Sequence, residues 1–255
     1  MFDEPFAHGS SPVHGLDPRV RLAMAGIFSV CVAMLREPAA AGAALLLALV
    51  ILALSAPPMK QLCKRVALVN VFIVFLWLTV PLTMPGAPVL TLGPLTVSRE
   101  GVELVWLATL KSNAILLTFL ALVTSMDSPT MGHALNRLGA PSKLVFLFLF
   151  TYRYLHVIAD EWQRLLTAAR LRGFALRTGM HTYRTIGNLL AMVLVNSFDR
   201  SGRVYQAMLL RGFQGRFASV VRFKARRQDA LFAALWLMAT AGLVLMDLFP
   251  EAFFV

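Results

Sequence analysis

The sequence contains the same pattern of alanine, arginine, glycine and phenylalanine twice. The two stretches read AARLRGF, residues 168–174, and AMLLRGF, residues 207–213. In a helix, residues four apart lie on one face, so the alanine leaves open space beside the arginine. Glycine is the residue expected just beyond a helix end. Each stretch therefore predicts a helix whose last turn presents a guanidinium group. The residues concerned are Ala168, Arg172, Gly173, Ala207, Arg211 and Gly212.

A guanidinium at a helix end can bind a carboxylate or backbone carbonyl groups through two parallel hydrogen bonds, and the small alanine lets another surface approach. Two such ends in one chain favour two copies of one partner, each with a groove for one helix end. The alternative for either stretch alone is an arginine that contacts lipid phosphates beside an ordinary helix-capping glycine. The repetition favours the protein partner.

The composition indicates a membrane protein. Of the 255 residues, 58% are hydrophobic and only 15% are charged, and the mean hydropathy is +0.70. These values are far from those of ordinary soluble domains. The net charge of +11 fits an anionic membrane surface or an acidic protein partner, and the hydrophobicity argues against nucleic acid as the partner.

Five apolar stretches approach the roughly 20 residues that a helix needs to cross a bilayer. They are residues 20–36, 39–56, 66–84, 101–125 and 229–249. The first two are separated by a short polar stretch that ends in Pro38, which predicts a tight helical hairpin with the proline at the start of its second helix. The predicted fold class is an all-α polytopic membrane protein with about five transmembrane helices.

The positive charges assign the two sides of the membrane. Residues 57–65 carry three lysines or arginines, whereas the longer stretch 81–100 carries one. The positive-inside rule places the first stretch in the cytoplasm and the second outside. The N-terminus is then expected in the cytoplasm.

Residues 127–227 are predicted to form a cytoplasmic helical domain inserted before the last span. From residue 160 to residue 227 there are 12 arginines and one lysine against three acidic residues. If the apolar stretch within residues 143–162 crossed the membrane, this basic region would lie outside, so we expect a cytoplasmic or interfacial helix there, with a sixth span as the alternative. The apolar run 186–198 is only 13 residues long, which suits a buried amphipathic helix.

The predicted organisation has three parts. They are a tail and four spans in residues 1–126, the inserted domain in residues 127–227, and a last span in residues 228–255.

The sequence offers no catalytic group, metal site or cofactor site. The five histidines form no HExxH pattern and no close pair with a cysteine, and no GxxxxGK[ST] stretch is present, so ATP would be hydrolysed by another chain. A stand-alone channel or carrier would need polar residues on several spans or repeated halves. An intramembrane enzyme would need clustered acids or histidines. Neither pattern is found.

Lys111 and Asn113 lie inside the fourth apolar stretch. Polar groups at membrane depth face protein or water, because lipid cannot satisfy them. We expect this face to contact a substrate-binding membrane subunit. The alternative is a lysine that snorkels or pairs within its own helix bundle.

These features resemble the T component of energy-coupling factor (ECF) transporters, the membrane-embedded coupling subunit of bacterial ABC-type importers. The paired Ala-x-x-x-Arg-Gly stretches carry the resemblance, together with LDPRVRLA at residues 16–23 and ALNRLGAP at residues 134–141. The stretch YRYLHVIADEWQRLLTAARLRGF, residues 152–174, is similar to the CbiQ type of the cobalt and nickel branch.

The resemblance implies a multi-pass protein of the bacterial inner membrane that helps to import Co²⁺. Arg172 and Arg211 would contact two cytoplasmic ATPase subunits, Ala168 and Ala207 would be their small neighbours, and the glycines would end the helices. It also implies a metal-binding, CbiM-like membrane S component, with a small accessory membrane subunit. A nickel importer or a T component shared by vitamin transporters is the alternative, and the two ATPase subunits can be identical or different.

Overall fold

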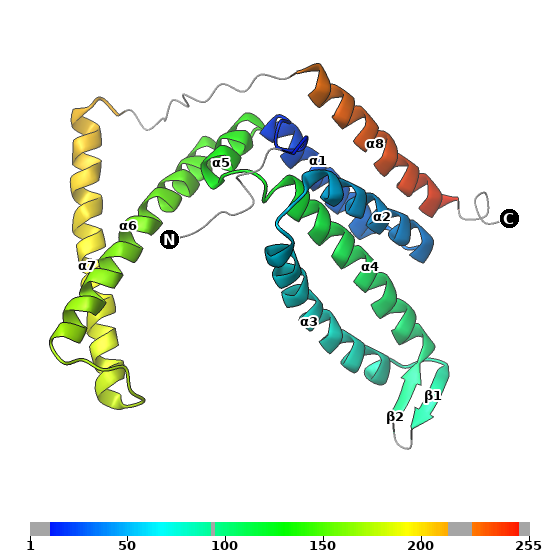
Figure 1. The fold of residues 1–255 in the computed structure, drawn as a ribbon, viewed down its shortest axis with the longest axis horizontal. Helices are drawn as coiled ribbons and strands as arrows, with labels where there is room; N and C mark the ends of the chain where they lie inside the picture. Colours follow the sequence, from blue (N-terminus) through cyan, green and yellow to red (C-terminus); the bar gives the residue numbers. More distant parts are fainter. Residues whose placement is uncertain (1–10, 93–94, 214–225, 250–255) are drawn as a thin grey trace. The chain divides into compact units, whose positions relative to one another are not determined.

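The computed structural model describes residues 11–92, 95–213 and 226–249, which are almost entirely helical (Figure 1). The elements in chain order are α1 (Pro18–Met34), α2 (Pro38–Ser55), α3 (Met59–Thr83), β1 (Pro88–Leu92), β2 (Leu95–Ser98), α4 (Arg99–Leu122), α5 (Ser128–Arg137), α6 (Ser142–Leu171), α7 (Met180–Leu210) and α8 (Arg227–Leu248). The two strands pair antiparallel. The predicted all-α polytopic class is confirmed, with this one small hairpin added.

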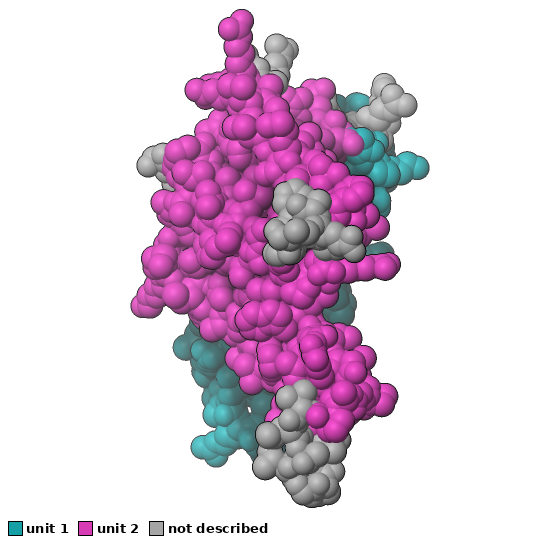
Figure 2. All heavy atoms as spheres, turned by 90° about the vertical axis from the view of Figure 1, so that its right-hand side faces the viewer, with its two compact units in different colours: residues 1–3, 139–221 teal, residues 4–138, 222–255 magenta. Residues whose placement is uncertain are grey.

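The chain divides into two compact units, coloured separately in Figure 2. The bundle unit comprises residues 4–138 and 222–255, and the two-helix unit comprises residues 1–3 and 139–221. Helix α5, predicted within the inserted domain, belongs to the bundle unit instead. The reason is that α5 packs against α1.

The core of the bundle unit is built on small side chains. Along one face of α2, Ala40, Ala44 and Ala48 are completely buried, and Ala114 and Ala121 of the facing α4 are buried to the same degree. Small residues at such spacing let two helix backbones approach closely, which is how membrane helices gain packing contacts without a hydrophobic driving force. Helix α2 accordingly packs most extensively against α4.

Aromatic residues attach α8 to the bundle unit. Phe28 of α1 is fully buried, and its ring centroid lies 5.2 Å from that of Trp236 of α8. The Trp236 indole N–H donates a hydrogen bond to the Met24 carbonyl at 3.3 Å. Helix α8 therefore packs against α1, although more than 200 residues separate Phe28 from Trp236 in the chain.

Within the described residues, five helices are long and apolar enough to cross a membrane, judged by length and composition: α2, α3, α4, α6 and α8. Four of them coincide with predicted spans. Helix α1, also predicted to span, has 17 residues, at the lower limit for crossing a bilayer. Helix α6 contains the ambiguous stretch 143–162, and its length and composition alone permit either interpretation.

Two predicted elements differ from the structure. The basic residues predicted in a loop at 57–65 lie in the first turns of α3, which begins at Met59. The predicted helix at 186–198 is the middle of α7, which has 31 residues, and few of its side chains are buried. A count of apolar residues finds only the apolar part of a helix, because polar helix-forming residues on either side extend it without changing the hydropathy.

Candidate functional site

The first Arg-Gly-Phe stretch ends α6, as its glycine predicted. Arg172 follows the last helical residue, and Gly173 has a φ of +86°. The Phe174 amide donates to the Ala169 carbonyl at 3.1 Å, and the Gly173 amide donates to the Arg170 carbonyl at 3.0 Å. These two hydrogen bonds form a Schellman motif, which satisfies carbonyl groups that the last helical turn leaves without partners.

The second stretch ends α7 in the same way. Gly212 has a φ of +79° and follows Arg211. The Phe213 amide donates to the Met208 carbonyl at 3.0 Å, and the Gly212 amide donates to the Leu209 carbonyl at 2.9 Å. The repeated sequence is therefore a repeated helix terminus. The phenylalanine, whose role the sequence analysis did not assign, is in both cases the residue that closes the motif.

Both helix ends expose a cation together with an apolar side chain. The alanine, arginine and glycine of each stretch are all exposed: Ala168, Arg172, Gly173, Ala207, Arg211 and Gly212. The leucine before each arginine is exposed as well, Leu171 to 85% and Leu210 to 91%. Each end therefore offers a guanidinium for an acidic group and a leucine for an apolar depression. The sequence analysis missed these leucines, because an apolar residue before a helix end carries no signal of its exposure.

The two helix ends lie at opposite ends of the two-helix unit. Helices α6 and α7 run in opposite directions (Figure 1), and the rings of Phe146, near the start of α6, and Phe213, after the end of α7, are 6.3 Å apart. Arg172 is 26 residues from Phe146 along α6, which corresponds to about 39 Å at 1.5 Å per residue. The two cationic ends are thus roughly 40 Å apart. One small groove cannot receive both.

A polar contact holds α6 and α7 together between these ends. One carboxylate oxygen of Glu161 accepts a hydrogen bond from the Asn196 amide group at 2.9 Å, and the other pairs with Arg200 at 3.4 Å. The Glu161 side chain is only 19% exposed. Partly buried ion pairs with an added hydrogen bond fix geometry better than exposed ones.

Lys111 and Asn113 find partners within the bundle unit. The Lys111 amine donates to the Ala33 carbonyl, in the last turn of α1, at 3.2 Å. Asn113 donates to the Thr109 carbonyl at 3.0 Å and exchanges hydrogen bonds of 3.1 and 3.4 Å with Asn70 of α3. Both side chains therefore join helices of this chain, in agreement with the internally paired alternative. Their contact with another subunit stays a prediction.

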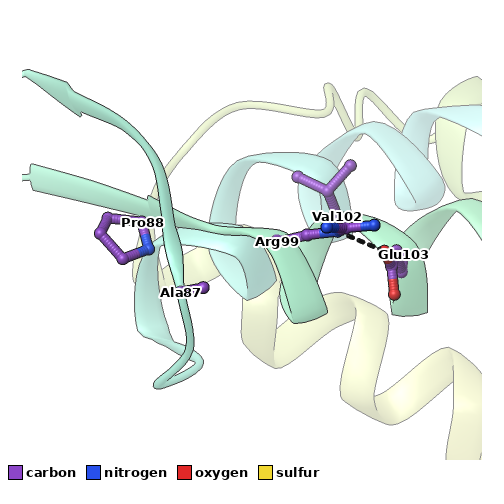
Figure 3. A pocket seen from close by; sticks show the side chains of 5 residues that line it. All are labelled: Ala87, Pro88, Arg99, Val102 and Glu103. Carbon is purple, nitrogen blue, oxygen red and sulfur yellow. Dashed lines mark hydrogen bonds and ion pairs between the residues drawn. The ribbon is translucent and has the colours of Figure 1, made fainter.

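A surface hollow of about 590 Å³ lies where the strands meet α4 (Figure 3). Its lining residues are Ala87, Pro88, Arg99, Val102 and Glu103. The guanidinium and carboxylate in this lining pair with each other at 2.8 Å, so the charges of the hollow neutralise one another. Among the residues that the structure describes, no three histidine, cysteine or acidic side chains come together as a metal site.

Two carboxylates hold α8 at its two ends, and the sequence analysis did not find their partners. Asp229 accepts a hydrogen bond from the Asp17 amide at 2.8 Å, at the start of α1. Asp247 accepts hydrogen bonds from the Arg36 and Glu37 amides, both at 2.7 Å, in the turn after α1. Helices α1 and α8 therefore run in the same direction. An acidic residue inside or beside an apolar helix was the available signal, but it names no partner.

Known proteins of one family match this chain over most of its length. The family described as CbiQ, cobalt transport protein, matches residues 9–220. The energy-coupling factor transporter transmembrane protein EcfT of Heliobacterium modesticaldum is 27% identical over 224 residues, 80% of this chain and 81% of that protein. EcfT of Bacillus selenitireducens is 26% identical over 231 residues, 84% of this chain and 86% of that protein.

A third relative is larger. A putative ABC transporter ATP-binding protein of Bifidobacterium longum is 26% identical over 198 residues, which cover 69% of this chain but 24% of that protein. The helical fold and the helices of spanning length agree with these matches. This multi-pass membrane protein belongs to the CbiQ cobalt transport protein family and is the T component of an energy-coupling factor transporter.

Proposed function

We propose that this chain couples two cytoplasmic ATPase subunits to a separate metal-binding membrane S component, CbiM-like, in an importer of Co²⁺. The observation that carries the proposal is the pair of equivalent helix ends, each with an exposed arginine and leucine, roughly 40 Å apart in one pair of helices. Two equal ends that far apart suit two equal grooves on a pair of subunits. A change in the distance between the grooves would then move the two-helix unit.

The geometry of the bundle unit supports a cytoplasmic position for both helix ends. The start of α1 is hydrogen-bonded to the end of α4 through Arg21 and Leu122, and to α8 through Asp17 and Asp229. The end of α4 and the start of α8 therefore lie on one side of the bundle unit. Residues between these points must cross the membrane an even number of times or not at all.

Composition favours no crossing between these points. Of the three helices there, α5 has only 10 residues and α6 is apolar enough to span. Helix α7, with Asn196, Asp199 and Arg200 in its second half, is not among the helices of sufficient hydropathy. Residues 214–225 are too few, since a span needs roughly 20. If α7 stays on one side, so must α6. The positive-inside rule then favours the cytoplasm for the two-helix unit and for the N-terminus.

The chemistry of the helix ends indicates what the ATPase grooves contain. A guanidinium binds a carboxylate through two hydrogen bonds, and the leucine beside it requires an apolar depression. A groove with an acidic rim and an apolar floor would satisfy both. The Bifidobacterium relative supports an ATPase partner, because it is named as an ATP-binding protein and about a quarter of its length resembles this chain. The sequence of this chain has no GxxxxGK[ST] stretch for ATP.

Cobalt as the transported metal rests on the description of the family. In this proposal the metal is bound by the S component, and the T component responds to ATPase movement through its helices. The complex lies in a bacterial inner membrane, and the small accessory membrane subunit completes it. The Lys111 and Asn113 face of α4 is the proposed contact with the S component.

Charge reversal at the two helix ends tests the proposal. We expect Arg172→Glu or Arg211→Glu alone to weaken binding of the ATPase subunits by at least about 30-fold, since removing one partner of a buried charged contact typically costs 2–5 kcal/mol or more. The double variant should lose ATPase copurification and Co²⁺ uptake but still insert into the membrane. Arg203→Glu is the matched control, because it reverses an exposed arginine of α7 outside the two stretches. Normal uptake by the double variant would contradict the proposal.

A further inference from the structure

The first turn of α1 is hydrogen-bonded to the segment that leads from α4 into α5 and to the start of α8. It belongs to the stretch LDPRVRLA, residues 16–23, whose charges the coupling proposal does not use. Asp17 and Arg21 are four residues apart, at the start of one helix, and both are almost completely buried. Their hydrogen bonds reach α4 on one side and α8 on the other.

Arg21 fixes the path of the chain from α4 into α5, the last helix before the two-helix unit. Arg21 is only 2% exposed, and its Nε donates to the carbonyl of Leu122, the last residue of α4, at 3.1 Å. Its Nη2 donates to the hydroxyl of Ser125, which in turn donates to the Ala121 carbonyl at 2.6 Å. Carbonyl groups at a helix end lack partners within the helix and attract a cation. Arg21 therefore holds both the end of α4 and the connection that leads to α5.

Asp229 fixes the start of α8, where the chain returns from the two-helix unit. It is 3% exposed, and one of its carboxylate oxygens accepts the Asp17 amide at 2.8 Å while the other accepts the Arg226 amide at 2.6 Å. The backbone that comes back from the two-helix unit is thus tied to the residue that begins α1. The same turn of α1 therefore restrains the α4–α5 connection and the start of α8, and α5, after which the chain passes into the two-helix unit, also packs against α1.

The energetic character of Arg21 argues against a role in stability alone. Burying a charged group costs free energy unless it is paired, and an apolar side chain of similar size packs at lower cost. Among the described residues, no carboxylate forms an ion pair with Arg21. What the guanidinium provides is a set of directed hydrogen bonds to a helix end and a loop, which specifies position.

We infer that this first turn of α1 is the pivot of the T component, with Arg21, its acceptor Ser125, and Asp229, which accepts the Asp17 amide. Because the chain before and after the two-helix unit is fastened to α1, through α5 and the α4–α5 connection on one side and through Asp229 on the other, a displacement of that unit by the ATPase subunits reaches the membrane helices through α1, α4 and α8 together. Without the pivot, the segments before and after the two-helix unit would bend independently of each other. Movement of the ATPase subunits would then not reach the membrane helices. The inference rests on the proposed coupling function. Arg21, Ser125 and Asp229 are positioning residues in it.

The test uses the complete transporter in proteoliposomes and measures the metal imported per ATP hydrolysed. We expect Arg21→Met and Asp229→Ala to lower this ratio by about tenfold, within the range by which residues of a coupling network change coupling. ATPase subunits should still copurify, and ATP hydrolysis should persist. The ratio is measured with whichever of Co²⁺ and Ni²⁺ the unaltered complex imports.

Asp247→Ala is the matched control. Asp247 lies on the same helix as Asp229 and also accepts two backbone hydrogen bonds, but at the end of α8 away from both connections. It should lower the melting temperature while leaving the ratio of metal to ATP within about twofold of the unaltered value. An equal loss of coupling in Asp247→Ala, or an unchanged ratio in Arg21→Met and Asp229→Ala, would overturn the pivot.

If Arg21→Met does not insert into the membrane, Ser125→Ala tests the pivot in its place. It removes one acceptor of Arg21 and retains the bond to Leu122, so the protein should fold and the ratio should fall by about threefold. An unchanged ratio in this variant would count against the pivot. A complex that loses its ATPase subunits in the unaltered protein, or that imports neither metal, would contradict the coupling function itself.

Discussion

The bundle unit and the two-helix unit are both made of long helices, but only the first closes a core of its own. In the bundle unit, residues from α1, α2, α4 and α8 join one buried cluster. In the two-helix unit, α6 buries only Val145 and Leu166, and α7 buries Thr182, Leu189 and Val193. Large apolar side chains on the same helices are exposed: Leu171, Met180, Leu194, Phe198 and Leu210.

The difference shows which features determine the structure of each unit. Helices of the bundle unit end in contacts with one another, as Asp229 and Asp247 show at the two ends of α8. Helices of the two-helix unit end in exposed Schellman motifs, and the polar contact at Glu161 joins them between the ends. The bundle unit is therefore specified by packing. The two-helix unit is specified by its termini, and its apolar surface is available to other subunits or to lipid.

The largest expected effect separates the two units by their cores. Phe28→Ala removes a fully buried ring that packs on Trp236, so we expect it to lower the free energy of unfolding by about 3 kcal/mol. Phe198→Ala removes a ring that is 79% exposed, so the change should stay within about 0.5 kcal/mol. Unfolding of the purified chain in detergent, followed by circular dichroism, measures both. Similar losses in the two variants would show that the two-helix unit has a core of its own and would break the comparison.

The sequence predicted the parts of this structure that depend on local rules. Glycine tolerates positive φ, so Gly173 and Gly212 marked the helix ends within one residue. Pro38 marked the start of α2. The predicted spans in residues 39–56, 101–125 and 229–249 agree with α2, α4 and α8, because lipid requires long apolar runs whatever the tertiary structure.

The sequence could not predict contacts between distant segments. Asp229 accepts a hydrogen bond from the Asp17 amide, 212 residues away, and Asp247 accepts hydrogen bonds from amides more than 200 residues away. Nothing in the apolar pattern of α8 selects α1 as its neighbour. Asn70, the partner of Asn113, was missed for the same reason, because each amide is satisfied only when α3 and α4 are side by side. The exposure of Leu171 could not be predicted either, because it depends on which distant segments pack against the end of α6.

An intermediate effect separates the two kinds of glycine. Gly173→Ala puts a Cβ on a backbone with φ +86°, where an L residue is strained by roughly 1 kcal/mol or more, although the added atom meets nothing within 4 Å. Gly187→Ala, inside α7, also meets nothing within 4 Å but should stabilise the helix by about 0.5–1 kcal/mol. Unfolding in detergent gives the sign of each change. Equal signs would show that helix termini do not specify the two-helix unit.

The Gly173→Ala variant also sharpens the functional side of the comparison. A distorted end of α6 misplaces Arg172, so ATPase binding should weaken by more than the loss of stability explains. Gly187→Ala should leave binding unchanged. Binding of the purified ATPase subunits, measured at a temperature where all variants are folded, separates the two contributions. Unaltered binding by Gly173→Ala would mean that the ATPase groove tolerates a displaced arginine.

The smallest expected effect is a pH dependence confined to the bundle unit. Hydrogen bonds from the Arg19 side chain lower the pKa of Asp17 below its ordinary value of 3.8, against the opposing effect of burial. A lowered native pKa stabilises the folded state fully above pH 3.8, less as the pH falls below it, and not at all once the pH is below the native pKa. Asp17→Asn keeps a capping oxygen but loses the charge, so it should melt about 3 °C lower than the unaltered protein at pH 7. This difference should shrink as the pH falls below 3.8, because the unfolded chain then binds a proton that the folded state does not, and it should vanish once the pH is below the native pKa. A difference that stays constant from neutral to acidic pH would mean that the cap, and not the charge of Asp17, holds the start of α1.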